Sequence, residues 1–82
     1  MQSNYFTESF SKISEEKRQK ILNVAIEEFS EHGFGSANIN NIAKKAGVSV
    51  GSLYKYFDNK EHLFLTVIHH GVEILKNVLQ EI

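Results

Sequence analysis

A four-residue turn, residues 46–49, constrains this chain more than any other feature of its sequence. The turn joins two short segments, 39–46 and 50–56, whose apolar residues recur at helical spacing. A connection this short that contains a glycine favours two helices crossing at a steep angle. Gly47 can take a positive φ without steric penalty, so it ends the first helix. The sequence therefore predicts a helix-turn-helix motif over about residues 38–57.

Composition favours a single all-α domain. The chain has 82 residues, and its hydrophobic share of 41% is ordinary for a folded protein. Proline is absent and glycine occurs five times, which favours long uninterrupted helices. The absence of cysteine excludes a disulfide framework and a thiolate zinc site. We predict an all-α, homeodomain-like three-helix bundle that carries the motif, followed by a long fourth helix.

Capping signals place the first helix before the motif. Ser14 is a predicted N-cap, and acidic residues follow it at the positive end of the helix dipole. The predicted helix covers 15–32, and Gly33 is expected to end it as a left-handed C-cap. Phe34 is expected to plug the core from the connection that follows. The residues expected to be buried share helical spacing within their segments: Ile21, Leu22, Ala25, Ile26, Phe29, Ile39, Ile42, Ala43, Ala46, Leu53, Phe57, Leu63, Phe64, Val67 and Ile68.

The remaining helix starts also have capping candidates. Asn38 and Ser49 are predicted to cap the two helices of the motif. Asp58 and Glu61 are three residues apart, a spacing that predicts a capping box for the fourth helix. That helix is expected to start at residue 59 or 60 and to run to the end of the chain.

Three regions follow from these signals. Residues 1–14 are expected to be an N-terminal arm, either mobile or ordered only by packing its aromatic residues on the body. Residues 15–60 form the predicted domain that carries the helix-turn-helix, and residues 61–82 begin the fourth helix. Apolar residues continue along Val72 to Ile82, where the shorter helices cannot cover them. We therefore expect a partner, or a domain not present in this chain, to cover that end.

Charge and polar groups gather on the motif. The net charge is −1, yet residues 38–60 carry four basic residues and one acidic residue, and both flanks are acidic. A local basic segment suits the phosphates of a nucleic acid, although charge alone fits a solvated face equally well. The second helix of the motif adds groups that suit a DNA backbone or base edge: Ser49, Ser52, Tyr54, Lys55 and Tyr56. These features together favour double-stranded DNA as the partner.

One block of the sequence resembles a known family. The block AGVSVGSLYKYFDNKEHL, with the Gly-Phe pair at 33–34 and Ile42-Ala43 before it, resembles the DNA-binding domain of tetracycline-repressor (TetR) family regulators. The resemblance implies a repressor that a small effector releases from a palindromic operator. It also implies a larger helical domain, absent from this chain, that binds the effector and forms the homodimer. No cofactor is implied.

The site residues are expected to divide between bases and phosphates. Asn40, at the start of the first motif helix, and Lys55 are the predicted base readers. Val50 offers a methyl surface to thymine, and Gly51 lets the helix lie close to the base edges. The residues expected to contact the DNA backbone are Asn38, Lys44, Ser49, Ser52, Tyr54, Tyr56 and Lys60.

Each of these roles has a structural alternative. Ser49 caps its helix whether or not it touches phosphate, and either tyrosine can instead lie in the core with its hydroxyl satisfied there. Lys44, like Lys45, fits a solvated face. Lys60 is poorly placed for its own helix, at the end where the dipole attracts anions, which favours phosphate contact.

Other functions have little support in the sequence. His69 and Glu73 are spaced like a pair of zinc ligands, but nothing supplies the remaining ligands, so no metal site is predicted. No catalytic set and no phosphate-binding glycine loop is recognisable, so we expect no enzyme. The alternative is a protein-interaction module that pairs through the fourth helix. The first residues lack the basic start and apolar core of a signal peptide, and no apolar run approaches the length of about 18 residues that spans a bilayer. We therefore expect a cytoplasmic protein without membrane contact.

Overall fold

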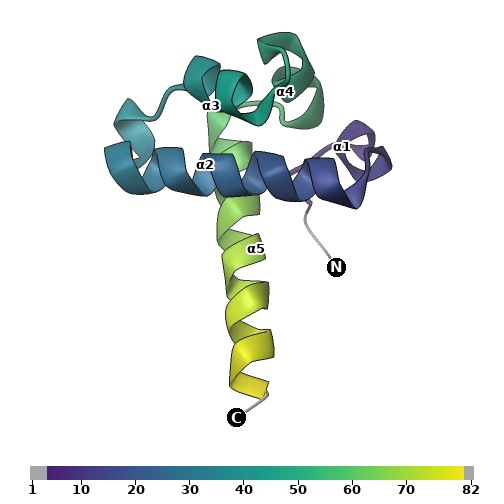
Figure 1. Cartoon of the computed structure of the whole chain (residues 1–82), viewed down its shortest axis with the longest axis vertical. Helices are drawn as coiled ribbons and strands as arrows, with labels where there is room; N and C mark the ends of the chain where they lie inside the picture. Colours follow the sequence, from purple (N-terminus) through teal and green to yellow (C-terminus); the bar gives the residue numbers. More distant parts are fainter. Residues whose placement is uncertain (1–3, 81–82) are drawn as a thin grey trace.

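Helices form the framework of the described part of the chain (Figure 1). The structure is a computed structural model and describes residues 4–80. Within this range the helices are α1 (Glu8–Lys12), α2 (Glu15–Ser36), α3 (Ile39–Ala46), α4 (Val50–Tyr56) and α5 (Lys60–Gln80). The predicted all-α fold with a helix-turn-helix and a long last helix is confirmed.

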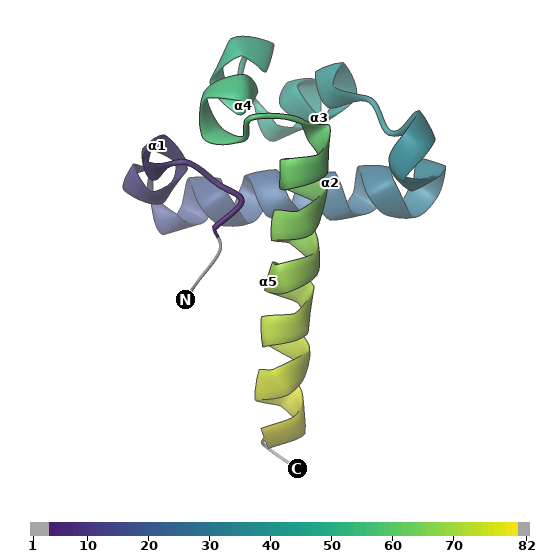
Figure 2. The ribbon, with the colours of Figure 1, turned by 180° about the vertical axis from the view of Figure 1, so that it is seen from behind.

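Two long helices cross, and the short ones lie at one end of the crossing. α2 runs across α5, and α3 and α4 lie beside the first turns of α5 (Figures 1 and 2). α2 packs on both α3 and α5, while α4 packs on α3 and α1. The motif therefore lies at the opposite end of the molecule from the end of α5.

The core forms where the four longer helices meet. Ala25 and Ile42 have no exposed surface, and Leu63 is 1% exposed. Of the residues predicted to be buried, most are buried in the structure; Ile26, Ile39 and Phe64 are half-buried and pack against the core. Ile68 is the exception, since it is 43% exposed. Helical spacing thus identified the core correctly until the part of α5 that leaves the body.

Three of the four predicted N-caps are confirmed. The Ser14 hydroxyl accepts a hydrogen bond from Lys17 N at 3.2 Å. Oδ1 of Asn38 accepts from the amides of Asn40 at 2.7 Å and Asn41 at 3.3 Å. These bonds satisfy amides that have no partner inside the first turn of a helix.

The predicted capping box of the last helix is wrong. Asn59 caps α5 instead, because its Oδ1 accepts from His62 N at 2.8 Å. With Lys60 as the first helical residue, Asp58 lies one residue too early to cap, and Glu61 lies in the second position rather than the third. Asp58 instead approaches His62 at 3.8 Å.

The end of α2 also differs from the prediction. Gly33 has a positive φ of 74°, but its ψ of 170° is extended, so it is a break in α2 rather than a left-handed cap. One more helical turn follows and ends at Ser36. Phe34 does not plug the core: it is 40% exposed, and its ring packs beside Phe29 and Phe64 at the rim. Residues 33–36 are all exposed, so this last turn of α2 lies outside the core.

The N-terminal segment is packed on the body. Phe10, on α1, is 3% exposed, and Phe6 and Ile13 pack against the core. Residues 1–14 were expected to be either mobile or ordered by the packing of their aromatic residues. For the described part of this segment, the second alternative is the one observed. The helix α1 itself was not predicted. Residues 1–3 of the arm lie outside the described residues.

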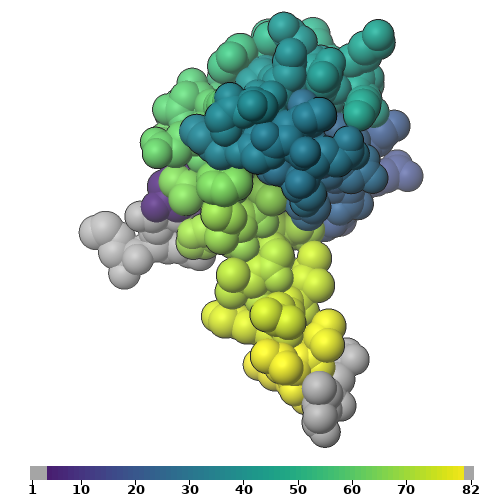
Figure 3. Space-filling model, turned by 90° about the vertical axis from the view of Figure 1, so that its left-hand side faces the viewer, coloured from purple at the N-terminus to yellow at the C-terminus, as the bar shows by residue number. Residues whose placement is uncertain are grey.

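The last part of α5 projects from the body (Figure 3). All residues from 71 to 80 are exposed, and the large apolar ones are about half exposed. The exposed row consists of Val72, Ile74, Leu75, Val78 and Leu79. The prediction that this chain leaves apolar surface uncovered here is confirmed up to residue 80; Ile82 lies outside the described residues. In the part of the chain that the structure describes, no helix has the length and hydropathy needed to cross a bilayer.

Candidate nucleic-acid interface

The turn between α3 and α4 is fixed by its backbone. Gly47 has φ 76° and ψ 27°, a left-handed conformation, and its N–H donates to Lys44 O at 3.3 Å. The N–H of Val48 donates to Ala43 O at 3.0 Å. These two bonds form a Schellman motif, which closes the end of α3 and sets the direction of the chain into α4.

One face of α4 is anchored and the other is free. Leu53 on α4 and Phe57 just after it are each 2% exposed, so they hold the helix on the core. Gly51, Tyr54 and Lys55 are exposed. Positions i, i+3 and i+4 lie on one side of a helix, so these three residues form a single outward face. We call Gly51, Tyr54 and Lys55 the α4 outer face.

The start of α4 is closed by two serines. Oγ of Ser49 accepts from Ser52 N at 3.0 Å and donates to Ser52 Oγ at 2.9 Å. The predicted cap is confirmed, and the phosphate contacts of both serines stay predictions. Val50 is half-buried against the core, so only part of its side chain remains for a thymine methyl group.

The start of α3 is exposed beside this helix. Asn38 and Asn40 are both exposed. Because Oδ1 of Asn38 caps α3, its amide nitrogen is the group left to donate outward. Lys44 and Lys45 are exposed in the last turn of α3, which agrees with a solvated face for both. The structure leaves the phosphate role of Lys44 and the base-reading role of Asn40 as predictions.

A buried carboxylate supports the start of α3, and the sequence reasoning missed it. Glu28 is 2% exposed, and its Oε2 accepts from the backbone N–H of Asn38 at 2.9 Å. A carboxylate at this point also complements the positive end of the α3 dipole. The signal was present in the spacing, since Glu28 follows the buried Ile21 by two helical turns and Ala25 by one.

The two tyrosines of α4 differ in burial. Tyr54 is 50% exposed, whereas Tyr56 is half-buried and its ring lies 5.9 Å from that of Phe10. Tyr54 is therefore free to reach a phosphate. The ring of Tyr56 is packed, which agrees with the core interpretation. Its phosphate contact stays a prediction.

Lys60 has a structural role that the sequence argument did not foresee. Its Nζ donates to the carbonyl oxygens of Gly35 at 3.3 Å and Ala37 at 3.2 Å. It also lies 4.8 Å from the centre of the Phe34 ring, a cation–π arrangement. Lys60 thus has a structural role even though its charge is unfavourable at the start of its own helix, because it ties the start of α5 to the last turn of α2 and to Ala37. Its contact with phosphate stays a prediction.

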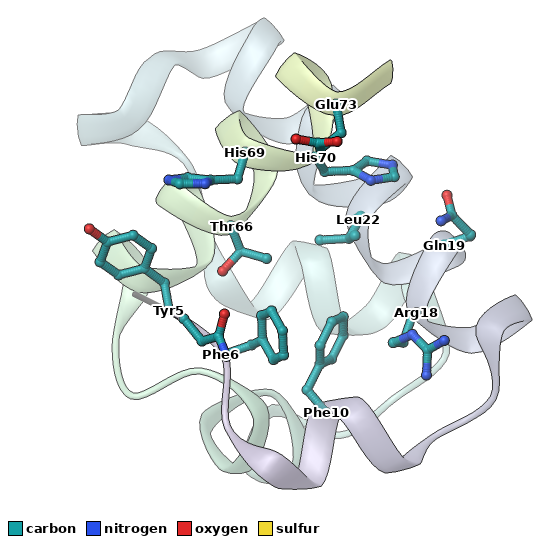
Figure 4. Close-up of a pocket in the computed structure, with 11 residues that line it drawn as sticks. Tyr5, Phe6, Phe10, Arg18, Gln19, Leu22, Thr66, His69, His70 and Glu73 are labelled. Carbon is teal, nitrogen blue, oxygen red and sulfur yellow. The ribbon is translucent and has the colours of Figure 1, made fainter. Parts of the chain in front are cut away.

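Away from the motif, a hollow of about 750 Å³ lies between the N-terminal segment, α2 and α5 (Figure 4). Residues from α3 and α4 do not line it. Tyr5 lies against His62 and His69 at its edge, with ring centres 5.5 and 5.6 Å apart. Among residues 4–80, no cluster of three or more histidine or acidic side chains is arranged to hold a metal ion.

This arrangement defines the class of the protein. A fixed turn, one helix anchored in the core and a second supporting helix are the parts of a helix-turn-helix DNA-binding domain. The sequence model of the family described as "Bacterial regulatory proteins, tetR family" matches residues 21–67. The chain therefore belongs to the TetR family, and it is the DNA-binding domain of a transcriptional regulator rather than an enzyme.

Known relatives agree with this assignment. The chain is 44% identical over 69 residues to the HTH-type transcriptional regulator HbdR of Aromatoleum sp. (strain CIB), which covers 83% of the chain and 27% of HbdR. It is 45% identical over 51 residues to the HTH-type transcriptional regulator AcrR of Shigella flexneri, covering 62% of the chain and 24% of AcrR. The crystal structure of a TetR family transcriptional regulator from Chloroflexus aurantiacus J-10-fl superposes with a TM-score of 0.87 and 34% identity, over 96% of this chain and 36% of that one. The chain thus spans about a quarter to a third of the length of these relatives.

Proposed function

We propose that the chain reads a specific sequence in duplex DNA by placing the α4 outer face in the major groove. The observation that carries this proposal is the α4 outer face itself: Gly51, Tyr54 and Lys55 are exposed on a helix whose opposite face is fixed in the core. A major groove admits a helix and presents a distinct pattern of donors and acceptors for each base pair. In this proposal Lys55 and Asn40 read base edges.

Backbone contacts set the position of the helix on the duplex. Tyr54 and Lys60 donate to phosphates, as do Asn38 and Ser49 at the two helix starts. Lys44, Ser52 and Tyr56 complete the set of backbone contacts, while Val50 faces a thymine methyl group. Phosphate contacts fix register and orientation but carry no base information directly.

The whole regulator is proposed to be a cytoplasmic repressor. Residues 15–60 bind DNA, and residues 61–82 lead into a helical regulatory domain that binds a small effector and forms the homodimer. The apolar row on the last part of α5 supports this, because such a row is what a packed helical domain covers. Two copies then read the inverted halves of a palindromic operator, with recognition helices about 34–36 Å apart or a multiple of that distance.

Selection from random duplexes tests the first part of the proposal. We expect the chain to enrich one short half-site at low salt and to bind it weakly as a monomer. Affinity is expected to fall steeply as salt rises, because lysines that neutralise phosphates release condensed counterions. Binding that does not change with salt, or no binding at low salt, contradicts the proposal.

The same selection on the dimeric regulator tests the second part. The expected result is an inverted repeat of the half-site, which the addition of effector releases. An asymmetric single site for the dimer contradicts the proposed arrangement.

A further inference from the structure

The end of α4 is closed by a residue from the other end of the chain. Oγ1 of Thr7 donates to Lys55 O at 2.7 Å, and the N–H of Thr7 donates to Tyr56 O at 2.9 Å. The last carbonyl groups of a helix have no partner inside the helix, so an external donor is needed to satisfy them. Thr7 therefore supplies two bonds to the final turn of α4.

The hydroxyl of Thr7 is used for α4 rather than for its own helix. Thr7 precedes α1 in the N-cap position, where a threonine hydroxyl ordinarily accepts from an amide of the first turn. Here the Thr7 side chain makes no capping bond to α1. This choice of partner is the first indication that α1 supports α4.

Aromatic packing holds Thr7 in place. The Phe10 ring lies 4.8 Å from that of Phe57 and 5.4 Å from that of Phe6. Figure 4 shows Phe6 and Phe10 side by side below the hollow. Phe10 is 3% exposed, so it anchors α1 under the end of α4.

The opposite end of α1 is tied to α2. Nη1 of Arg18 donates to the carbonyl oxygens of Ser11 at 3.1 Å and Ile13 at 2.6 Å. Arg18 also pairs with Glu15, and hydrogen bonds from Gln19 and Arg18 lower the pKa of the Glu15 carboxyl. Residues 6–13 are thus bonded to α2 on one side and to α4 on the other, and we call them the N-terminal brace.

The N-terminal brace contacts the turn of α4 that carries Lys55, the proposed base-reading residue. α4 has only seven residues, and a helix of that length is marginal without tertiary support. Lys55 is in its last turn, the part that would fray first. We propose that the N-terminal brace is a positioning element for DNA recognition: Thr7 holds the final turn of α4 so that Lys55 meets its base pair in one orientation. This inference rests on the proposed function of α4.

Substitutions at Thr7 separate positioning from general stability. Thr7→Val keeps the shape and the backbone N–H but removes the hydroxyl donor, and Thr7→Ser restores a donor. Ser11→Ala is the matched control, since Ser11 Oγ donates to Glu8 O at 2.7 Å within α1 and does not involve α4. Affinities for the selected site and for random duplex are measured at one salt concentration, together with amide hydrogen exchange at Phe57.

Thr7→Val is expected to lower the ratio of specific to random affinity by about two- to tenfold, the usual worth of one hydrogen bond. Binding to random duplex is expected to stay the same, because phosphate contacts tolerate a less ordered Lys55. Exchange at Phe57 is expected to accelerate. Thr7→Ser and Ser11→Ala are expected to match the wild type in all three measurements.

The outcomes distinguish the two proposals. If the wild type reads a site and Thr7→Val behaves like Ser11→Ala in affinity ratio and exchange, the brace proposal is overturned while the proposed function stands. If the wild type shows no sequence preference, the proposed function fails, and the positioning role fails with it. Faster exchange at Phe57 in Thr7→Val alone then shows that the brace supports only the fold.

Discussion

α4 and the last part of α5, residues 71–80, are both helical, but they are held in opposite ways. α4 is short, is capped by Ser49, is anchored by Leu53 and is closed by Thr7. Residues 71–80 are all exposed, and none of them belongs to the core. The free face of α4 is polar or small, whereas the free face of α5 is apolar. The two surfaces therefore suit different partners. The α4 face suits a charged partner that forms hydrogen bonds, whereas the apolar face of α5 suits another apolar helix surface.

The largest difference is expected in stability. Leu53→Ala removes a side chain that is 2% exposed, so it should lower the free energy of unfolding by about 2–5 kcal/mol or abolish cooperative unfolding. Leu75→Ala removes one that is 57% exposed, and its effect should stay within about 0.5 kcal/mol. Urea unfolding followed by circular dichroism measures both. Equal losses would mean that the two helices are held alike.

The next effect concerns base discrimination. Lys55→Ala should cost about 1–3 kcal/mol of preference for the selected site and shift the consensus at one or two base pairs. Lys76→Ala is the matched control, because it removes the same charge from the exposed part of α5. Competition binding against a library of site variants provides the measurement. An unchanged consensus would assign Lys55 to a phosphate instead.

A smaller effect is expected from one hydroxyl group. Tyr54→Phe should weaken binding to specific and random duplexes alike, by about 0.5–1.5 kcal/mol, since a phosphate contact carries no base information. Stability should not change, because the side chain is 50% exposed. Tyr5→Phe, which alters a tyrosine beside α5, controls for the loss of a hydroxyl elsewhere. A relaxed consensus in Tyr54→Phe would show that this residue reads bases.

The smallest effect compares two glycines. A Cβ added at Gly51 would meet only Ser49 Oγ at 3.9 Å, and one added at Gly71 would meet nothing within 4 Å. Both Gly→Ala changes should therefore raise the free energy of unfolding, by up to about 1 kcal/mol. Only Gly51→Ala should weaken DNA binding, because its methyl group would separate α4 from the base edges. Equal DNA affinity for the two variants would contradict the proposal that Gly51 lets α4 lie close to the base edges.

Local chemistry explains what the sequence predicted well. Asn38, Gly47 and Ser49 each act on residues within a few positions of themselves, so their roles are visible in the order of the residues. The failure at Asp58 has the same local origin. Asn59 also caps well, and a shift of one residue decides which side chain meets the first free amides of α5.

Contacts between distant segments explain what the sequence did not predict. Thr7 bonds a carbonyl 48 residues away, and Lys60 bonds carbonyl groups 23 and 25 residues before it. Glu28 accepts from the amide of Asn38, 10 residues later and beyond the break at Gly33. Helical spacing indicates which face of a helix is buried. It does not indicate which polar group of a distant segment forms a hydrogen bond there. The brace and the Lys60 tie could therefore emerge only from the packed structure.

The most direct test of this account is a nuclear magnetic resonance titration of the chain with a duplex that carries the selected site, at low salt. We predict that the amide signals of the α4 outer face and of Asn38 and Asn40 shift, while those of residues 71–80 keep their positions. Shifts concentrated on residues 71–80, or no shift on α4 at any ratio of DNA to protein, would contradict the claim that α4 is the surface that reads DNA.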